Sequence, residues 1–285
     1  MSHPFVSVVV EKEVNNKMSE TKLEFKSKET EEAIVSVESK HASLYKAGGA
    51  LLVLAGVFYV ICTVAALTPG TNGWAEPPFV SAATFITAMA NHARTAYVTW
   101  TFFTLTDFLA VPVMIAFYFA LRGVNRDALV VGIGLGLMSV ILDAAVAEVG
   151  FFTGTSLSVT WAATTDPALK AAYFVAANQA VLQTEFAWTY SYLAGFAAWL
   201  IIALVMRKSF FGKWIGGLGV ILCALFVLDM VSVYVLPSIA GNLILPLQLA
   251  FVVFFVTAGR RLYGQGSRQS KLRTSVNSGQ HQIGK

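Results

Sequence analysis

Six long apolar segments, separated by polar stretches, dominate the hydrophobic pattern of this chain. Each segment is close to the ~20 residues that an α-helix needs to cross about 30 Å of hydrocarbon. The pattern predicts an all-α fold, a polytopic six-helix transmembrane bundle within residues 45–262. The predicted spans are Ala47–Leu67, Tyr97–Leu121, Leu129–Phe152, Glu185–Met206, Trp214–Leu236 and Asn242–Gly259.

The two ends of the chain lack this pattern. Residues 1–44 are rich in Glu, Lys, Ser and Val, with too few large apolar side chains to bury a core. Opposite charges four residues apart, as in Glu24 and Lys28, support a marginal helix there. We expect residues 1–44 to be a disordered or partly helical polar tail, and residues 263–285 to be a disordered basic tail.

Composition supports a membrane location. Apolar residues make up 56% of the chain and charged residues 13%, whereas a soluble domain has about 25% charged residues. Half of the 16 acidic residues precede Lys46, so few charges are left for a water-facing surface. The net charge of +4 does not indicate nucleic-acid binding, because the basic residues lie in the tails and short loops. The expected partner is the lipid bilayer.

The loops differ in their content of basic residues, and this predicts the orientation. Lys and Arg concentrate in both tails and in the loops at 122–128 and 207–213. The loops at 68–96 and 153–184 hold one basic residue each, and the loop at 237–241 holds none. Positive charge marks the cytoplasmic side. We therefore expect a multi-pass protein of the cell membrane with cytoplasmic N- and C-termini.

The first two outer loops are long, and both contain helix signals. Asp166-Pro167 has the pattern of a helix N-cap followed by proline at the first helical position. The fourth helix is therefore expected to begin well outside the membrane. Residues 79–95 are expected to form a helix on the outer surface.

Three spans carry an aspartate at the same depth. Asp107, Asp143 and Asp229 lie almost equally far along the chain from the cytoplasmic ends of their spans, which are Leu121, Leu129 and Trp214. At the α-helical rise, each aspartate is about 21 Å from that end. A carboxylate in hydrocarbon costs about 2.5–3.5 kcal/mol or more, so these acids must face the bundle interior or be protonated. This acidic layer predicts a site that binds a cation or a proton.

Two further acids and one arginine lie closer to the outer side. Glu148 follows Asp143 by five residues, which rotates it about 140° away on a regular α-helix. Glu185 sits at the outer rim of the fourth span. Both join the cation- and proton-binding candidates. Arg94, just before the second span, is the candidate counter-ion, in a salt bridge to Glu148 or Glu185.

The sequence predicts no cofactor and no metal site. The four histidines lie outside the spans, so axial ligands for a haem are missing there. Cys62 and Cys223 lie inside spans without metal-ligand spacing. The Gly132-x-Gly134-x-Gly136 string follows no strand, so it indicates close helix packing rather than nucleotide binding. Because catalytic motifs are also absent, a non-enzymatic role is favoured.

Two stretches resemble an uncharacterised family of prokaryotic six-span membrane proteins, a domain of unknown function. The first has Asp107 early in the second span, then Phe117-Tyr118-Phe119-Ala120-Leu121 and Val124-Asn125-Arg126. The second runs from Val205 to Gly219, where Lys213-Trp214 replaces a proline-containing step of the family pattern. The resemblance covers roughly residues 45–262 and implies a fold rather than an activity.

Three classes of function remain open on sequence alone. The leading hypothesis is a membrane protein that handles a small solute, a cation or protons through the acidic layer. The second is a non-catalytic scaffold that binds a partner, or further copies of itself as a homo-oligomer, through its small-residue faces or its N-terminal tail. The third is a membrane-embedded lipid-modifying enzyme, for which only Glu148 and Glu185 lie near an interface.

Overall fold

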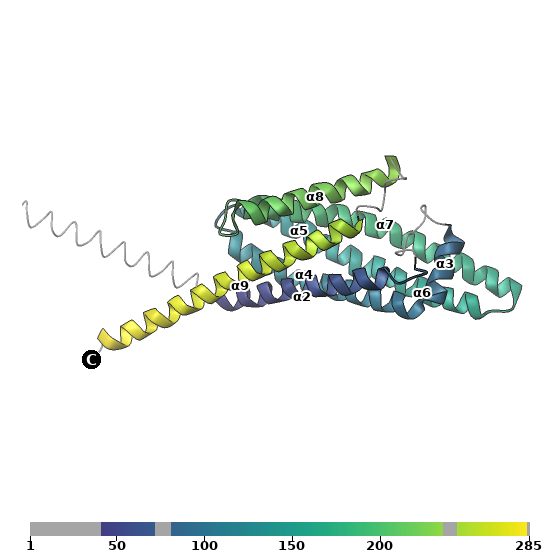
Figure 1. Cartoon of the computed structure of the whole chain (residues 1–285), viewed down its shortest axis with the longest axis horizontal. Coiled ribbons are helices and arrows are strands. Elements are labelled where there is room, and N and C mark those ends of the chain that lie inside the picture. Colours follow the sequence, from purple (N-terminus) through teal and green to yellow (C-terminus); the bar gives the residue numbers. More distant parts are fainter. Residues whose placement is uncertain (1–40, 72–80, 236–243, 284–285) are drawn as a thin grey trace, which may run out of the picture. The chain divides into compact units, whose positions relative to one another are not determined.

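Every element in the described part of the chain is helical. The structure is a computed structural model that describes residues 41–71, 81–235 and 244–283. Residues 44–264 form one compact unit, and residues 41–43 and 265–283 are the described part of a second. The elements in Figure 1 are α2 (Ala42–Ala66), α3 (Ala82–Asn91), α4 (Ala93–Leu121), α5 (Arg126–Leu142), the π-helical turn η2 (Asp143–Ala147), α6 (Glu148–Ala163), α7 (Pro167–Met206), α8 (Gly212–Val235) and α9 (Ile244–Ile283).

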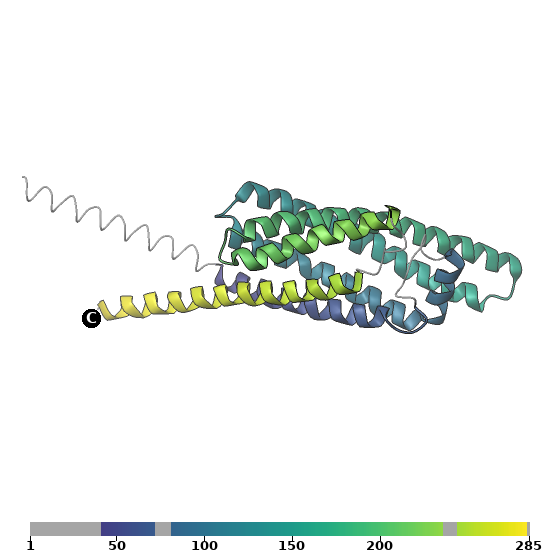
Figure 2. The ribbon, with the colours of Figure 1, turned by 45° about the horizontal axis from the view of Figure 1, so that its top comes forward.

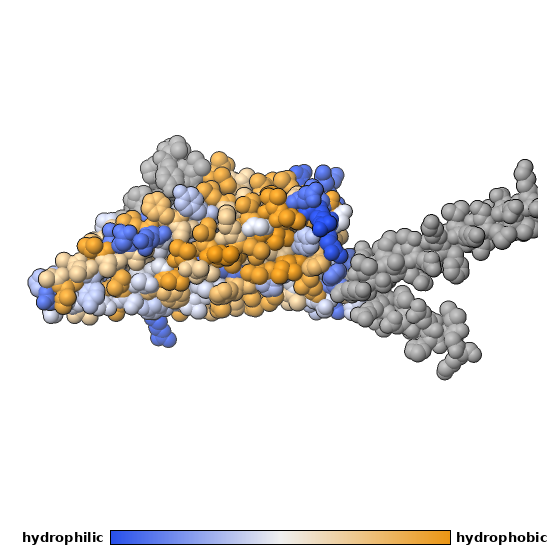
Figure 3. Space-filling view, turned by 180° about the vertical axis from the view of Figure 1, so that it is seen from behind, coloured by the Kyte–Doolittle hydropathy of each residue, from blue (hydrophilic) through white to orange (hydrophobic). Residues whose placement is uncertain are grey.

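Within the described residues, five helices are long and apolar enough to cross a membrane. They are α2, α4, the continuous helix Arg126–Ala163, α7 and the Gly212–Asp229 part of α8. Large apolar side chains such as Val64, Phe108 and Ile141 are exposed on them, as in a lipid-facing surface. The face seen in Figure 3 is accordingly mostly hydrophobic, with the largest hydrophilic group at the right-hand end of the view and smaller ones in its left half. These features indicate an integral membrane protein.

The predicted sixth span begins at Asn242, which lies outside the described residues. Its described part belongs to α9, which begins at Ile244 and continues to Ile283. The count of six spans therefore stays a prediction. The structure gives helix through Ile283 where the sequence favours a disordered tail, and no proline interrupts the chain after Pro246. The predicted tail at 1–44 falls almost entirely outside the described residues.

Both helices around the connection at 164–166 are longer than a span. Arg126–Ala163 has 38 residues and α7 has 40, so each measures almost 60 Å at the α-helical rise. The predicted loop at 153–184 is therefore mostly helix, with a connection of only three residues, 164–166. Hydroxyl groups that favour loops instead donate hydrogen bonds to carbonyl groups four residues earlier, as Thr155 does to Phe151 and Ser158 to Gly154.

The predicted start of the fourth helix is confirmed. Oδ1 of Asp166 accepts hydrogen bonds from the backbone N–H groups of Ala168 and Leu169 at 2.8 and 3.2 Å, and Pro167 is the first helical residue. The predicted helix at 79–95 is shorter than expected, because α3 ends at Asn91 and α4 begins at Ala93. The α3 helix packs mainly against α6.

The bundle is built around α7, which packs against α5, α6 and α8. Helix α2 and the first part of α9 lie side by side in Figures 1 and 2. Their backbones approach closely at two glycines. A Cβ atom added to Gly49 would lie only 2.5 Å from the carbonyl oxygen of Gly259. The apolar core draws on α2, α4, α5, α7, α8 and α9. These helices enclose the candidate site.

Two adjacent glycines in α8 offer a matched test of this packing. A Cβ atom on Gly216 would lie 2.6 Å from the backbone nitrogen of Arg207 and 2.7 Å from the carbonyl oxygen of Ala203. A Cβ atom on Gly217 would meet nothing within 4 Å. We predict that Gly216→Ala lowers the thermal unfolding temperature, since overpacking costs about 1–3 kcal/mol. Gly217→Ala should leave it unchanged or raise it slightly, because alanine favours helix. Equal effects of the two changes would contradict this packing.

Candidate functional site

Two of the predicted aspartates face each other across neighbouring helices. A short turn at 122–125 connects α4 to α5, and the side chain of Asn125 caps α5 by accepting a hydrogen bond from Ala128. Asp107 lies 14 residues before the end of α4 at Leu121, and Asp143 lies 17 residues after the start of α5 at Arg126, so the antiparallel helices bring them to neighbouring levels. Both line the same cavity. The structure thus pairs two members of the acidic layer.

Glu148 joins this pair because the helix changes its geometry between the two acids. The backbone N–H of Glu148 donates to the carbonyl oxygen of Asp143, which closes an i→i+5 turn. This turn stacks Glu148 close to Asp143 on the same face. The sequence predicts that a regular α-helix rotates Glu148 about 140° away from Asp143. That prediction is wrong, because the π-helical turn replaces the regular helix here. π-Helical turns of this kind occur frequently at functional sites.

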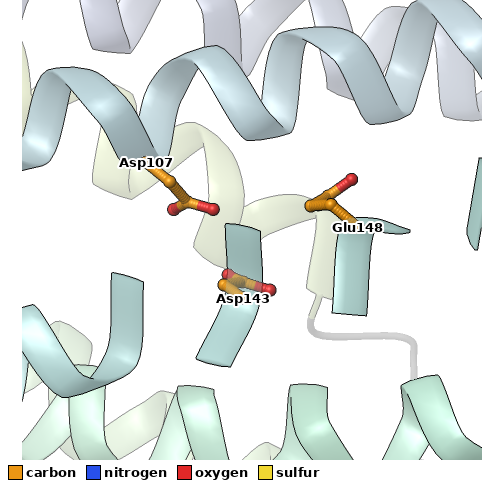
Figure 4. A group of neighbouring side chains, drawn as sticks. All are labelled: Asp107, Asp143 and Glu148. Atoms are coloured by element: carbon orange, nitrogen blue, oxygen red, sulfur yellow. The ribbon is translucent and has the colours of Figure 1, made fainter. Parts of the chain in front are cut away.

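The three acids form a compact group inside the bundle. One carboxylate oxygen from each of Asp107, Asp143 and Glu148 lies within 4.8 Å of the other two. Figure 4 shows the side chains directed toward a shared space, Asp107 from one helix and the other two from the facing one. The Glu148 side chain is only 1% exposed. We refer to these three residues as the acidic cluster.

The neighbouring hydroxyl groups leave part of the two aspartates without donors. Thr104 and Thr106 donate to the carbonyl oxygens of Trp100 and Phe102, each at 2.8 Å, and so are committed to their own helix. In the described part of the chain, Oδ2 of Asp107 and Oδ1 of Asp143 are buried and accept no hydrogen bond. Hydroxyl groups alone therefore do not account for these carboxylates.

Ser191 is the hydroxyl group that reaches toward the cluster from α7. It lies beside Asp143 and also donates to the carbonyl oxygen of Ser139 at 3.0 Å. The hydroxyl oxygens of Ser139 and Ser191 are 3.1 Å apart. This pair fixes α5 against α7 at the level of Asp143 and supplies neutral polar groups, but no positive charge.

The predicted counter-ion does not reach the acids. Arg94 is exposed and lines a shallow surface depression with Tyr97 and Phe102. Within the described ranges it forms no ion pair, so the expected salt bridge to Glu148 or Glu185 is not formed. Carboxylates this close repel one another, and they cannot all stay ionised unless a cation or protons compensate them.

A cavity of about 120 Å³ opens beside the cluster at the centre of the bundle. Asp107, Asp143, Thr106 and Ser139 supply polar groups to its lining, and within the described residues the lining contains no Lys, Arg or His. Most of the remaining surface is an aromatic wall, which consists of Tyr59, Phe103, Tyr192, Phe196, Trp199, Phe226, Phe251 and Phe255. Glu148 does not line the cavity and so stands behind the two aspartates.

The other predicted acids lie elsewhere. Asp229 is buried in α8, at 3% exposure, three residues beyond the cavity residue Phe226, but it is neither in the acidic cluster nor among the cavity-lining residues. Glu185 is half-buried in α7 and also lies outside both groups. Of the five acids that the sequence singles out, the structure brings together Asp107, Asp143 and Glu148.

The cluster has the chemistry of a site for a hard cation. A cation held at about 2.0–2.6 Å by several oxygens keeps them no more than roughly 5 Å apart. The three carboxylate oxygens already satisfy this spacing. Carboxylates favour Mg²⁺, Mn²⁺ or Ca²⁺ over the metals that thiolates bind. The sequence predicts no metal site, because its histidines lie outside the spans and its cysteines lack metal-ligand spacing.

Residues 54–259 match a family model described as a domain of unknown function, DUF4386. The chain belongs to this family. The DUF4386 match spans the whole acidic cluster and all but one of the cavity-lining residues. It agrees with the resemblance seen in the sequence and assigns no activity. No curated protein and no solved structure matches the chain.

Proposed function

We propose that this membrane protein handles a small cationic solute, which it binds at the acidic cluster in exchange for protons. The observation that carries the proposal is the convergence of Asp107, Asp143 and Glu148 beside a cavity inside membrane-spanning helices. The proposal includes a bundle of six spans in the cell membrane with both termini cytoplasmic. The distribution of Lys and Arg supports that topology.

The energetic cost of the cluster supports a binding role. An ionised carboxylate within the bilayer costs at least about 2.5–3.5 kcal/mol, so the two aspartates alone would cost roughly 5–7 kcal/mol. This is comparable to the total stability of an ordinary domain, about 5–15 kcal/mol. A compensating cation or proton removes most of this cost. Carboxylates that alternate between the two can couple the binding of a cation to the release of a proton.

The two alternatives receive less support. A lipid-modifying enzyme needs its acids near an interface, whereas Asp107 and Asp143 lie about 21 Å from the cytoplasmic ends of their predicted spans by residue count, slightly beyond the midplane of about 30 Å of hydrocarbon. A scaffold needs apolar or small-residue faces, and it gains nothing from buried like charges beside a cavity. Cation binding uses both the cluster and the cavity.

The proposal predicts that Asp143→Asn weakens cation binding by roughly tenfold to a hundredfold, the usual value of one charge-assisted contact. Asparagine keeps the shape of the side chain but removes its charge. In the experiment, Na⁺, Mg²⁺, Mn²⁺ or a small organic ammonium ion is added to purified protein in weak buffer. A pH-sensitive dye measures the protons that the protein releases. The wild-type protein should release protons on addition of at least one of these cations.

Asp127→Asn is the matched control. Asp127 is an exposed acid in the first turn of α5, the helix that leads directly into the π-helical turn at Asp143. It should release protons like the wild-type protein. The proposal fails if Asp107→Asn, Asp143→Asn and Glu148→Gln all behave like the wild-type protein between about pH 5 and 8, the range in which a buried carboxyl group titrates. The acids would then be structural, and the scaffold would be preferred.

A further inference from the structure

We infer that the cation is a small organic ammonium ion, whose charge lies against Asp107 and Asp143 and whose hydrocarbon part lies against the aromatic wall. This inference rests on the proposed function and specifies its substrate class. It follows from the composition of the cavity as a whole, whereas the acidic cluster alone is equally suited to an inorganic cation.

The larger part of the aromatic wall is a continuous run of rings from three helices, α7, α8 and α9. The ring centroids of Phe196 and Phe226 are 4.5 Å apart, and those of Phe226 and Phe251 are 4.9 Å apart. Phe255 continues the contact, with its centroid 5.8 Å from that of Phe251 and 5.6 Å from that of Trp199. Helices α7, α8 and α9 thus present ring faces and edges to one space.

Tyr59 and Phe103 extend the aromatic lining on α2 and α4. Their rings meet edge to face with centroids 5.8 Å apart. Phe103 lies four residues before Asp107 on α4, so aromatic surface and carboxylate follow each other along one helix face. A ligand in the cavity therefore contacts both kinds of group at once.

Each other class of ligand leaves part of this lining unused. An anion is repelled by the carboxylates, and a neutral apolar solute leaves their charge uncompensated. An inorganic cation takes oxygen ligands from the acids but needs no aromatic surface. An organic ammonium ion uses the whole lining, because ring faces attract a cation most strongly where water is excluded.

The volume of the cavity limits the size of the ligand. At about 120 Å³ it is slightly smaller than a cavity of about 150 Å³ that admits benzene. An ammonium ion with roughly five or six non-hydrogen atoms matches this space. Long amphiphilic amines exceed it.

Glu148 completes the arrangement from behind the two aspartates. It does not line the cavity, yet a carboxylate oxygen lies within 4.8 Å of an oxygen of each aspartate. The ammonium ion therefore meets Asp107 and Asp143, while Glu148 is placed to take up or give away a proton as the ion leaves or enters.

Two probes of equal size test the inference. Tetramethylammonium and tert-butanol each have five non-hydrogen atoms, but only the first is charged. Isothermal titration calorimetry on the full chain should show binding of tetramethylammonium, with tert-butanol at least about thirtyfold weaker. Trp199→Phe should weaken tetramethylammonium binding modestly and Trp199→Leu by roughly tenfold or more, since the attraction falls from Trp to Phe and vanishes in Leu.

Trp161→Leu is the control, because Trp161 lies near the end of α6 and is not a cavity residue. Thermal unfolding establishes that each variant is folded, and Trp199→Phe keeps the test valid if Trp199→Leu does not fold.

The inference is overturned if tert-butanol binds as well as tetramethylammonium, or if loss of the indole leaves ammonium binding unchanged. Proton release by inorganic cations without tetramethylammonium binding overturns the inference but leaves the proposed function standing. Absence of proton release with every cation removes both.

Discussion

The double variant Asp107→Asn/Asp143→Asn should unfold at a higher temperature than the wild-type protein when no cation is present. Each aspartate has a buried carboxylate oxygen that accepts no hydrogen bond within the described residues. The amide removes the charge and its repulsion from the other acids of the cluster. A gain of about 2–3 kcal/mol, or roughly 5–10 °C for a domain of this size, is expected.

The same variant should no longer respond to the cation. A ligand at about a hundred times its dissociation constant stabilises a protein by about 2.7 kcal/mol. The wild-type protein should therefore show a clear rise in unfolding temperature on addition of tetramethylammonium, and the variant should show none. Intrinsic tryptophan fluorescence during heating in detergent micelles measures both effects. A double variant that is less stable than the wild-type protein under both conditions would show that the aspartates stabilise packing.

The second large effect concerns topology, for which labelling gives an all-or-none result. Thr165→Cys in the outer connection should react with an impermeant thiol reagent added to intact cells, and Gly123→Cys in the α4–α5 turn should not. Thr165 is exposed next to the N-cap Asp166, which the substitution leaves intact, and a Cβ atom on Gly123 meets nothing within 4 Å. The native Cys62 and Cys223 are buried, so background labelling should be low. Labelling of Gly123→Cys but not Thr165→Cys would reverse the orientation.

Counting along regular helices was enough to place Asp107 and Asp143 at neighbouring levels. The α-helical rise is constant, and a short turn fixes α4 antiparallel to α5. The same counting misplaced Glu148, because the helical turn between Asp143 and Glu148 spans five residues where an α-helical turn spans four. The intervening Ala144, Ala145, Val146 and Ala147 carry no signal that distinguishes a π-helical turn from an α-helix.

The cavity could not be derived from the apolar pattern. In a soluble helix the buried face is apolar and the exposed face is polar, but in a membrane helix both faces are apolar. On α7, Phe196 is buried at 8% exposure while Phe186 is 67% exposed. Nothing local separates these two phenylalanines. Only the packing of six helices decides which rings meet in the aromatic wall.

The connection between α6 and α7 is shorter than the loop that the sequence predicts at 153–184. The sequence at 153–160 contains five Ser or Thr residues among eight and favours a loop. Hydrogen bonds from these hydroxyl groups to preceding carbonyl groups, such as Thr153 to Val149 and Thr160 to Ser156, are compatible with a continuous helix. The capping signal of Asp166-Pro167 was correctly interpreted because it depends on only a few neighbouring atoms.

The π-helical turn absorbs one residue of chain length between the last two acids. If one residue between Asp143 and Glu148 were deleted, the two acids would be four residues apart, and an ordinary α-helix would place them about 40° apart on one face. Asp107 and Asp143 would keep their places, since both precede the change. Chains with either spacing can therefore assemble all three carboxylates, provided that the longer spacing is accompanied by the π-helical turn.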